Sequence, residues 1–136
     1  MKKLLSTTYS DNAFNFALLV QRAVTGLLLI INHGLPKISN FSSVGANFFD
    51  PFNIGHRNSL MLSIFAELFC SMLLVLGLFT RIAAFIIFVN MAIAVFMFQK
   101  TDNLKTIEIP AMFLVSTFTL LLVGPGRVSV DGMMAK

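Results

Sequence analysis

Four long runs of apolar residues, separated by short polar stretches, organise the chain. They extend over about residues 13–33, 58–78, 82–98 and 109–123. A helix of about 20 residues, at 1.5 Å rise per residue, crosses the hydrocarbon core of a bilayer. The runs are continuous rather than alternating, so they predict membrane helices and exclude a membrane β-barrel. We therefore expect an all-α integral membrane four-helix bundle that forms one domain over residues 1–136.

The links between the runs set how the helices can be arranged. The second and third runs are joined only by Phe79-Thr80-Arg81, which forces these two helices into a tight antiparallel hairpin. The first run stops at His33-Gly34-Leu35-Pro36, a glycine–proline pattern typical of a helix end. The long loop that follows is rich in apolar side chains: Phe41, Phe48, Phe49, Phe52 and Ile54. We expect this loop to lie in the membrane interface or to fold back over the bundle as a lid.

Composition supports a membrane protein and excludes several other classes. Hydrophobic residues make up 57% of the 136 residues and charged residues only 12%, which is more apolar surface than a soluble domain of this length can bury. The net charge of +4 comes with no basic stripe interleaved with aromatics, so we expect no nucleic-acid partner. Cys70 is the only cysteine, which excludes an internal disulfide, a CxxC redox pair and a thiolate metal cluster. We expect no metal and no covalent cofactor.

Two opposite charges interrupt the apolar runs near their centres. Arg22 lies in the first run and Glu67 in the second. A charge at that depth costs on the order of 3 kcal/mol on insertion scales, so each side chain should face protein or water. We interpret them as a buried ion pair at matching depth, with Asn90 of the third run in the same polar layer. The pair is a candidate functional site, and the alternative is a structural ion pair that specifies helix packing without chemistry.

A second polar group is expected near one membrane surface. His33, Lys37 and Glu108 all fall on the side of the long loop. They form either the mouth of a path that leads to the Arg22–Glu67 layer or a set of interfacial anchors.

The basic residues divide almost evenly between the two ends of the bundle. Five lie on the side of the chain termini: Lys2, Lys3, Arg81, Arg127 and Lys136. Four lie on the other side: Lys37, Arg57, Lys100 and Lys105. Because positive residues favour the cytoplasmic side, this small excess predicts that both termini are cytoplasmic.

Several motifs, in order along nearly the whole chain, resemble those of one family. Arg22, Glu67 and Glu108 accompany three segments: His33-Gly34-x-x-Lys37, Leu76-Gly77-Leu78-Phe79-Thr80-Arg81 and Gly124-Pro125-Gly126-Arg127-Val128-Ser129-Val130-Asp131. Together they resemble the DoxX family of small four-helix membrane proteins. The resemblance implies a multi-pass protein of the bacterial cytoplasmic membrane that is associated with redox systems, as are thiosulfate:quinone oxidoreductase subunits and thiol or oxidative-stress complexes.

Three functional hypotheses follow. The first is a membrane subunit of a redox complex, at most an oxidoreductase accessory subunit without its own redox centre, in which Arg22 donates to a quinone oxygen and Glu67 exchanges a proton. The second is an assembly or scaffold protein that binds other membrane proteins, in which the charged pair only fixes the bundle. The third is a small transporter or proton path, which four short helices and the lack of an inverted repeat disfavour. Expected partners are the lipid bilayer and other membrane protein subunits, with a homo-oligomer as a further option.

Overall fold

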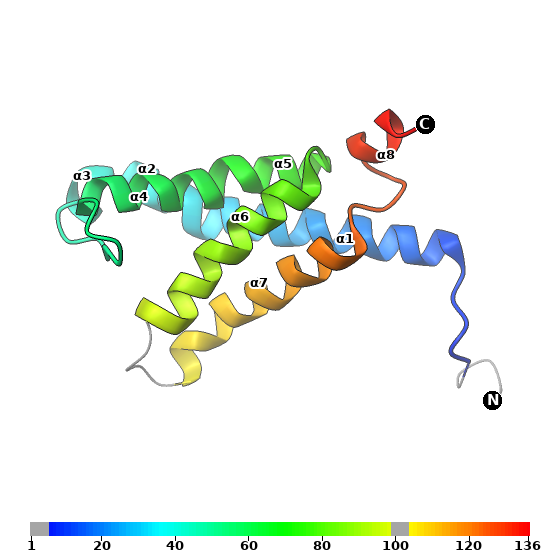
Figure 1. Ribbon diagram of the computed structural model, residues 1–136, viewed down its shortest axis with the longest axis horizontal. Helices are drawn as coiled ribbons and strands as arrows, with labels where there is room; N and C mark the ends of the chain where they lie inside the picture. The colour runs from blue at the N-terminus through cyan, green and yellow to red at the C-terminus, as the bar shows by residue number, and fades with distance from the viewer. Residues whose placement is uncertain (1–5, 99–103) are drawn as a thin grey trace.

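The computed structural model describes residues 6–98 and 104–136. Within that part, every regular element is a helix (Figure 1). Four helical stretches in it are long and apolar enough to cross a membrane: Asp11–Ser39, His56–Leu76, Thr80–Phe98 and Lys105–Val123. The predicted all-α fold with four membrane helices is confirmed. Three of the lysines used above for orientation lie outside the described residues: Lys2, Lys3 and Lys100.

The first membrane stretch is built from three consecutive pieces. Helix α1 (Asp11–Leu29) passes into a π-helical turn (Ile30–Gly34), which passes into α2 (Leu35–Ser39). The side chain of Ser10 caps α1 by accepting a hydrogen bond from the Ala13 backbone N–H at 3.2 Å.

The prediction that this helix ends at its glycine–proline pattern is wrong, because the helix continues to Ser39. Gly34 has ordinary right-handed helical angles, φ −66° and ψ −53°. A Cβ on Gly34 would lie 3.0 Å from the Cβ of Leu68 and 3.1 Å from the Glu67 carbonyl oxygen. The glycine therefore permits a close helix–helix contact rather than a chain reversal. Pro36 falls in the first turn of α2, where a missing N–H is tolerated.

The long loop and the second membrane stretch come next. Their elements are α3 (Phe41–Val44), α4 (His56–Ile64), a π-helical segment (Phe65–Cys70) and α5 (Ser71–Leu76). Asp50 organises the end of the loop, because its carboxylate accepts hydrogen bonds from the backbone of Ile54 and Gly55 and from the side chain of Ser59, at 3.1, 2.7 and 2.8 Å.

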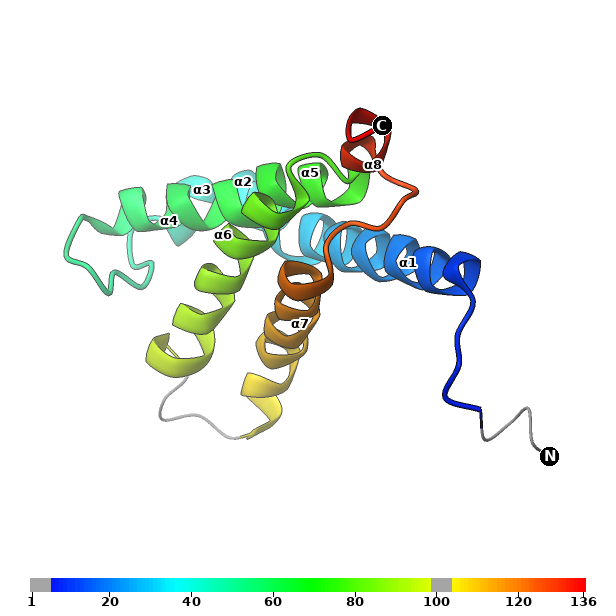
Figure 2. The same cartoon turned by 45° about the vertical axis from the view of Figure 1, so that its right-hand side comes forward.

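The second half of the chain begins with the predicted tight hairpin. Its elements are α6 (Thr80–Ile93), a π-helical segment (Ala94–Phe98), α7 (Leu104–Val123) and α8 (Val130–Met134). The turn between α5 and α6 has two residues in the left-handed region, Gly77 at φ 71° and Phe79 at φ 47°. Figures 1 and 2 show α6 and α7 side by side and α1 running along α5.

The apolar core lies where α1, α5, α6 and α7 meet. Its buried members are Leu18, Leu29, Cys70, Leu74, Ala83, Ala84, Ile87, Met91 and Leu120. Hydrogen bonds also join α1 to α7: Gln21 donates to the Ser116 carbonyl oxygen at 3.1 Å, and the hydroxyls of Thr25 and Ser116 are 2.7 Å apart. These polar side chains act as contacts between membrane helices.

Candidate functional site

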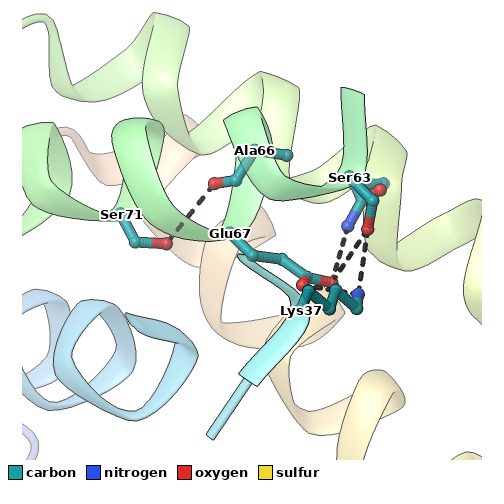
Figure 3. Close-up of polar contacts among 6 residues, drawn as sticks. Lys37, Ser63, Ala66, Glu67 and Ser71 are labelled. Carbon is teal, nitrogen blue, oxygen red and sulfur yellow. Dashed lines mark hydrogen bonds and ion pairs between the residues drawn. The ribbon is translucent and has the colours of Figure 1, made fainter. Parts of the chain in front are cut away.

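Glu67 lies in the π-helical segment between α4 and α5 and is only 3% exposed. Its Oε2 accepts a hydrogen bond from Lys37 Nζ at 2.5 Å, which is also an ion pair (Figure 3). Its Oε1 accepts from Asn90 Nδ2 at 3.1 Å and from Ser63 Oγ at 3.4 Å. Lys37 donates a second hydrogen bond to Ser63 Oγ at 2.9 Å. The buried carboxylate is thus neutralised and hydrogen-bonded by three side chains, which such a charge requires inside a bundle.

The predicted ion pair between Arg22 and Glu67, both within the described part of the chain, is not formed. Arg22 is 2% exposed and donates a hydrogen bond to the carbonyl oxygen of Val128. Its guanidinium occupies the space beside Gly77, since a Cβ there would lie 2.6 Å from the Arg22 Cζ. Both charges face inward as predicted, but at different depths.

The register between α1 and its partner helix explains the difference in depth. Gly34 is the residue that touches the backbone of Glu67, and it lies twelve residues beyond Arg22. Twelve residues at 1.5 Å each place Arg22 about 18 Å away along the helix axis. The matching-depth argument assumed that the helix ends at His33, whereas it runs on to Ser39.

Around Arg22 the C-terminal segment closes over the hairpin turn. The Asp131 backbone N–H donates to the Gly77 carbonyl oxygen at 2.9 Å. The Asp131 carboxylate accepts from the backbone N–H groups of Phe79 and Thr80, both at 2.8 Å. Partial burial raises the pKa of Asp131, but these hydrogen bonds and the charge of Arg22 outweigh it and hold that pKa below its ordinary value. The hairpin motif and the C-terminal motif therefore meet at one end of the bundle and hold it together.

A cavity of about 390 Å³ opens at the other end, beside Glu67. Its polar lining brings together four residues that the sequence singled out: His33, Lys37, Glu67 and Asn90. Ser63 lines the same part of the cavity. Its apolar lining includes Phe48, Phe49, Phe52, Leu62, Met91 and Phe98. Among the described residues that line the cavity, neither Arg22 nor Glu108 is present; Glu108 is exposed near the start of α7.

Aromatic residues of the long loop cover this cavity, so the loop folds back over the bundle. The ring centroids of Phe49 and Phe98 lie 5.2 Å apart, which joins the loop to the end of the third membrane stretch. Lys37 Nζ lies 5.6 Å from the ring centroid of Phe48, within the range of a cation–π contact. The ring of His33, which also lines the cavity, meets the ring of Phe113 edge to face at 5.7 Å.

The three π-helical segments in the described part of the chain all contribute to the cavity lining. His33 lies in the first segment, Glu67 in the second, and Ala94 and Phe98 in the third. Single π-turns within α-helices occur frequently at functional sites. Sequence reasoning missed the Lys37–Glu67 pair and these π-helical turns, and the only available signal for the aromatic wall was the phenylalanine content of the loop. Among the described residues, no group of three or more His, Cys, Asp or Glu side chains is placed to hold a metal ion.

The chain is similar to one known protein family. The family model described as DoxX matches residues 17–100, more than half of the chain, and this range contains His33, Lys37, Glu67 and Asn90. Searches of curated proteins and of solved structures found no match.

Proposed function

The chain belongs to the DoxX family, and from this premise we propose that it is a membrane subunit of a redox system that holds a quinone headgroup beside Glu67. The observation that carries the proposal is a buried carboxylate, paired with its own lysine, at the polar end of an aromatic cavity. In this proposal a partner subunit supplies the redox centre, and the protein itself contributes the quinone site.

The cavity suits a flat ring with polar groups at its edge. Its volume of about 390 Å³ lies within the range of small-molecule pockets. Lys37 uses two of its three N–H groups on Ser63 and Glu67, which leaves the third for a quinone oxygen. Asn90 uses one N–H on Glu67 and keeps the other. The role first expected of Arg22, donating to a quinone oxygen, therefore passes to Lys37.

Proton exchange with the quinone would pass through the same polar groups. Glu67 is the proton acceptor in this proposal, and His33, which lines the same cavity, carries protons toward the loop side. Pro110 lines the cavity, and Glu108, two residues earlier, is exposed. Glu108 would therefore lie at the mouth of the cavity.

The proposed setting is the cytoplasmic membrane of a bacterium. Figure 1 shows the start of α1 and helix α8 on one side of the bundle and the loop between α3 and α4 on the other. With both termini in the cytoplasm, as the basic residues favour, the cavity faces the outer side of the membrane.

A direct test compares two amide-to-leucine variants of the purified protein in detergent. Asn90→Leu removes a donor from the cavity, and Gln21→Leu removes a comparable amide that bonds Ser116 on another helix pair. Loss of one neutral hydrogen bond is worth about 1 kcal/mol, so Asn90→Leu should weaken binding of a short-chain 1,4-benzoquinone roughly fivefold, while Gln21→Leu binds like the parent. Equilibrium dialysis gives the dissociation constants. No binding by the parent, or equal binding by both variants, rejects the quinone site.

The contacts of Arg22 favour a second candidate function, which is the assembly of other membrane proteins. Its charge is used to hold the hairpin and the C-terminal segment rather than a ligand. A partner protein that copurifies equally with the parent and with Asn90→Leu, from a protein that binds no quinone, would establish this alternative.

A further inference from the structure

The polar end of the cavity has an uneven supply of hydrogen-bonding groups. The Glu67 carboxylate has about four acceptor positions, of which Lys37, Asn90 and Ser63 occupy three. The amide oxygen of Asn90 and the remaining lone pair of Ser63 add further acceptors. Free donors are fewer: Lys37 and Asn90 each retain one N–H, and a neutral His33, which also lines the cavity, adds one acceptor for its one donor. A ligand that donates hydrogen bonds, in particular to an anionic oxygen, therefore fits this end better than a ligand that only accepts them.

This asymmetry distinguishes the two redox forms of a quinone. The oxidised form has two carbonyl oxygens and can only accept, whereas the hydroquinone has two O–H groups and can donate to a carboxylate. The aromatic wall, with Phe48 and Phe98, contacts a flat ring in either form and does not discriminate. Selectivity for the redox state must then arise at Glu67.

We propose that the cavity is a hydroquinone site: it binds the reduced form of its quinone more tightly than the oxidised form, and the Glu67 carboxylate is the residue that makes the difference. The inference rests on the proposed quinone site and adds which redox form of the quinone that site binds more tightly. A hydrogen bond to a charged acceptor is among the stronger ones in proteins, and its contribution corresponds to about a tenfold or larger preference. A tenfold preference raises the midpoint potential of the bound two-electron couple by about 30 mV.

The test measures both redox forms on the same samples. The probe is a 1,4-naphthoquinone with a short alkyl chain, supplied oxidised or reduced with dithionite under anaerobic conditions, to the full-length protein in detergent. The parent should bind the hydroquinone about tenfold more tightly. Glu67→Gln should bring the ratio of the two dissociation constants close to one, with little change for the oxidised form. Glu67→Asp keeps a carboxylate and should retain a preference.

Two further measurements keep the test decisive. Because Glu67→Gln leaves Lys37 without its ion pair, the double variant Lys37→Met/Glu67→Gln provides a neutral site with no unpaired charge, and its ratio should also be close to one. A redox titration of the bound probe should show the raised potential in the parent and its loss in both variants. Equal binding of the two forms by the parent, or an unchanged ratio in both Glu67→Gln and Lys37→Met/Glu67→Gln, overturns the hydroquinone preference alone. Binding of neither form by the parent overturns the quinone site as well.

Discussion

Replacement of Gly77 by alanine tests whether Arg22 holds the hairpin turn in place. Gly77 has φ 71° and ψ 39°, and a Cβ there would lie 2.6 Å from both the Arg22 Cζ and the Ser129 Cβ. Both distances are far shorter than a van der Waals contact, so the guanidinium has to move out of its position. Its hydrogen bond to the Val128 carbonyl oxygen is then lost.

The expected loss of stability has two parts. A residue with a Cβ in the left-handed region costs about 1 kcal/mol. Loss of a hydrogen bond made by a charged donor costs about 2 kcal/mol. The sum, about 3 kcal/mol, corresponds to a fall in melting temperature of roughly 10 °C for a chain of this size.

Thermal unfolding of the purified protein in detergent measures this loss, and the chain offers a matched control. Gly55 also has a positive φ, 102°, but a Cβ there meets open space apart from the Asn58 side chain at 3.6 Å. Gly55→Ala should therefore show backbone strain alone, about 1 to 3 kcal/mol, because Gly55 has φ 102° and ψ 136° and no side chain to displace. In an Arg22→Ala background, Gly77→Ala should cost less than in the parent, because the clash with the guanidinium is gone and only the close contact with the Ser129 Cβ remains. An undiminished loss for Gly77→Ala in the Arg22→Ala background would refute the role assigned to Arg22.

Two other predictions concern Asp131 and the Lys37–Glu67 ion pair. Asp131 has a folded-state pKa below its ordinary value of 3.8, so its contribution to stability is complete above that value and is lost as the pH falls through the folded-state pKa. The melting temperature of the parent should fall between pH 5 and pH 2, about the range in which carboxylates titrate. The melting temperature of Asp131→Asn should fall less over the same range. Parallel curves of melting temperature against pH for the two proteins would contradict this. Lys37→Met leaves the Glu67 carboxylate buried without its counter-ion and should cost about 3 kcal/mol in thermal unfolding. Lys37→Met/Glu67→Gln should recover most of that loss, and a double variant as unstable as the single one would argue against the ion pair.

The four continuous apolar runs were sufficient to predict the bundle. Arg22 and Glu67 were predicted to face inward because a charge in lipid is costly, and both are almost fully buried. Periodicity defines the angular position of a side chain around its helix, but not its height relative to a neighbouring helix. That height depends on close contacts, such as Gly34 against Glu67, which only the packed structure defines. The pairing of Arg22 with Glu67 was therefore wrong even though both faces were correct.

The position of the long loop was also left open by the sequence, which allowed it to lie in the membrane interface or to fold back over the bundle. Its phenylalanines indicated an apolar surface, which either the membrane interface or the bundle can cover. The choice depends on tertiary contacts such as Phe49 with Phe98, between residues almost fifty positions apart. Asp50 also takes part, because its hydrogen bonds to Ile54 and Gly55 fix the chain just before α4. No local pattern in the sequence encodes these contacts.

The feature that made the first helix hard to predict is also the one that builds the cavity. If the chain left the helix at His33, Lys37 would lie in a loop and Glu67 would be a buried carboxylate without a counter-ion, at a cost of several kcal/mol. In the π-helical turn, the Leu35 N–H instead donates to the Ile30 carbonyl oxygen five residues earlier. Pro36, which has no N–H, then follows in the first turn of α2, where none is needed. The helix thereby passes a glycine–proline pattern that normally ends it, and its last turn brings Lys37 to Glu67.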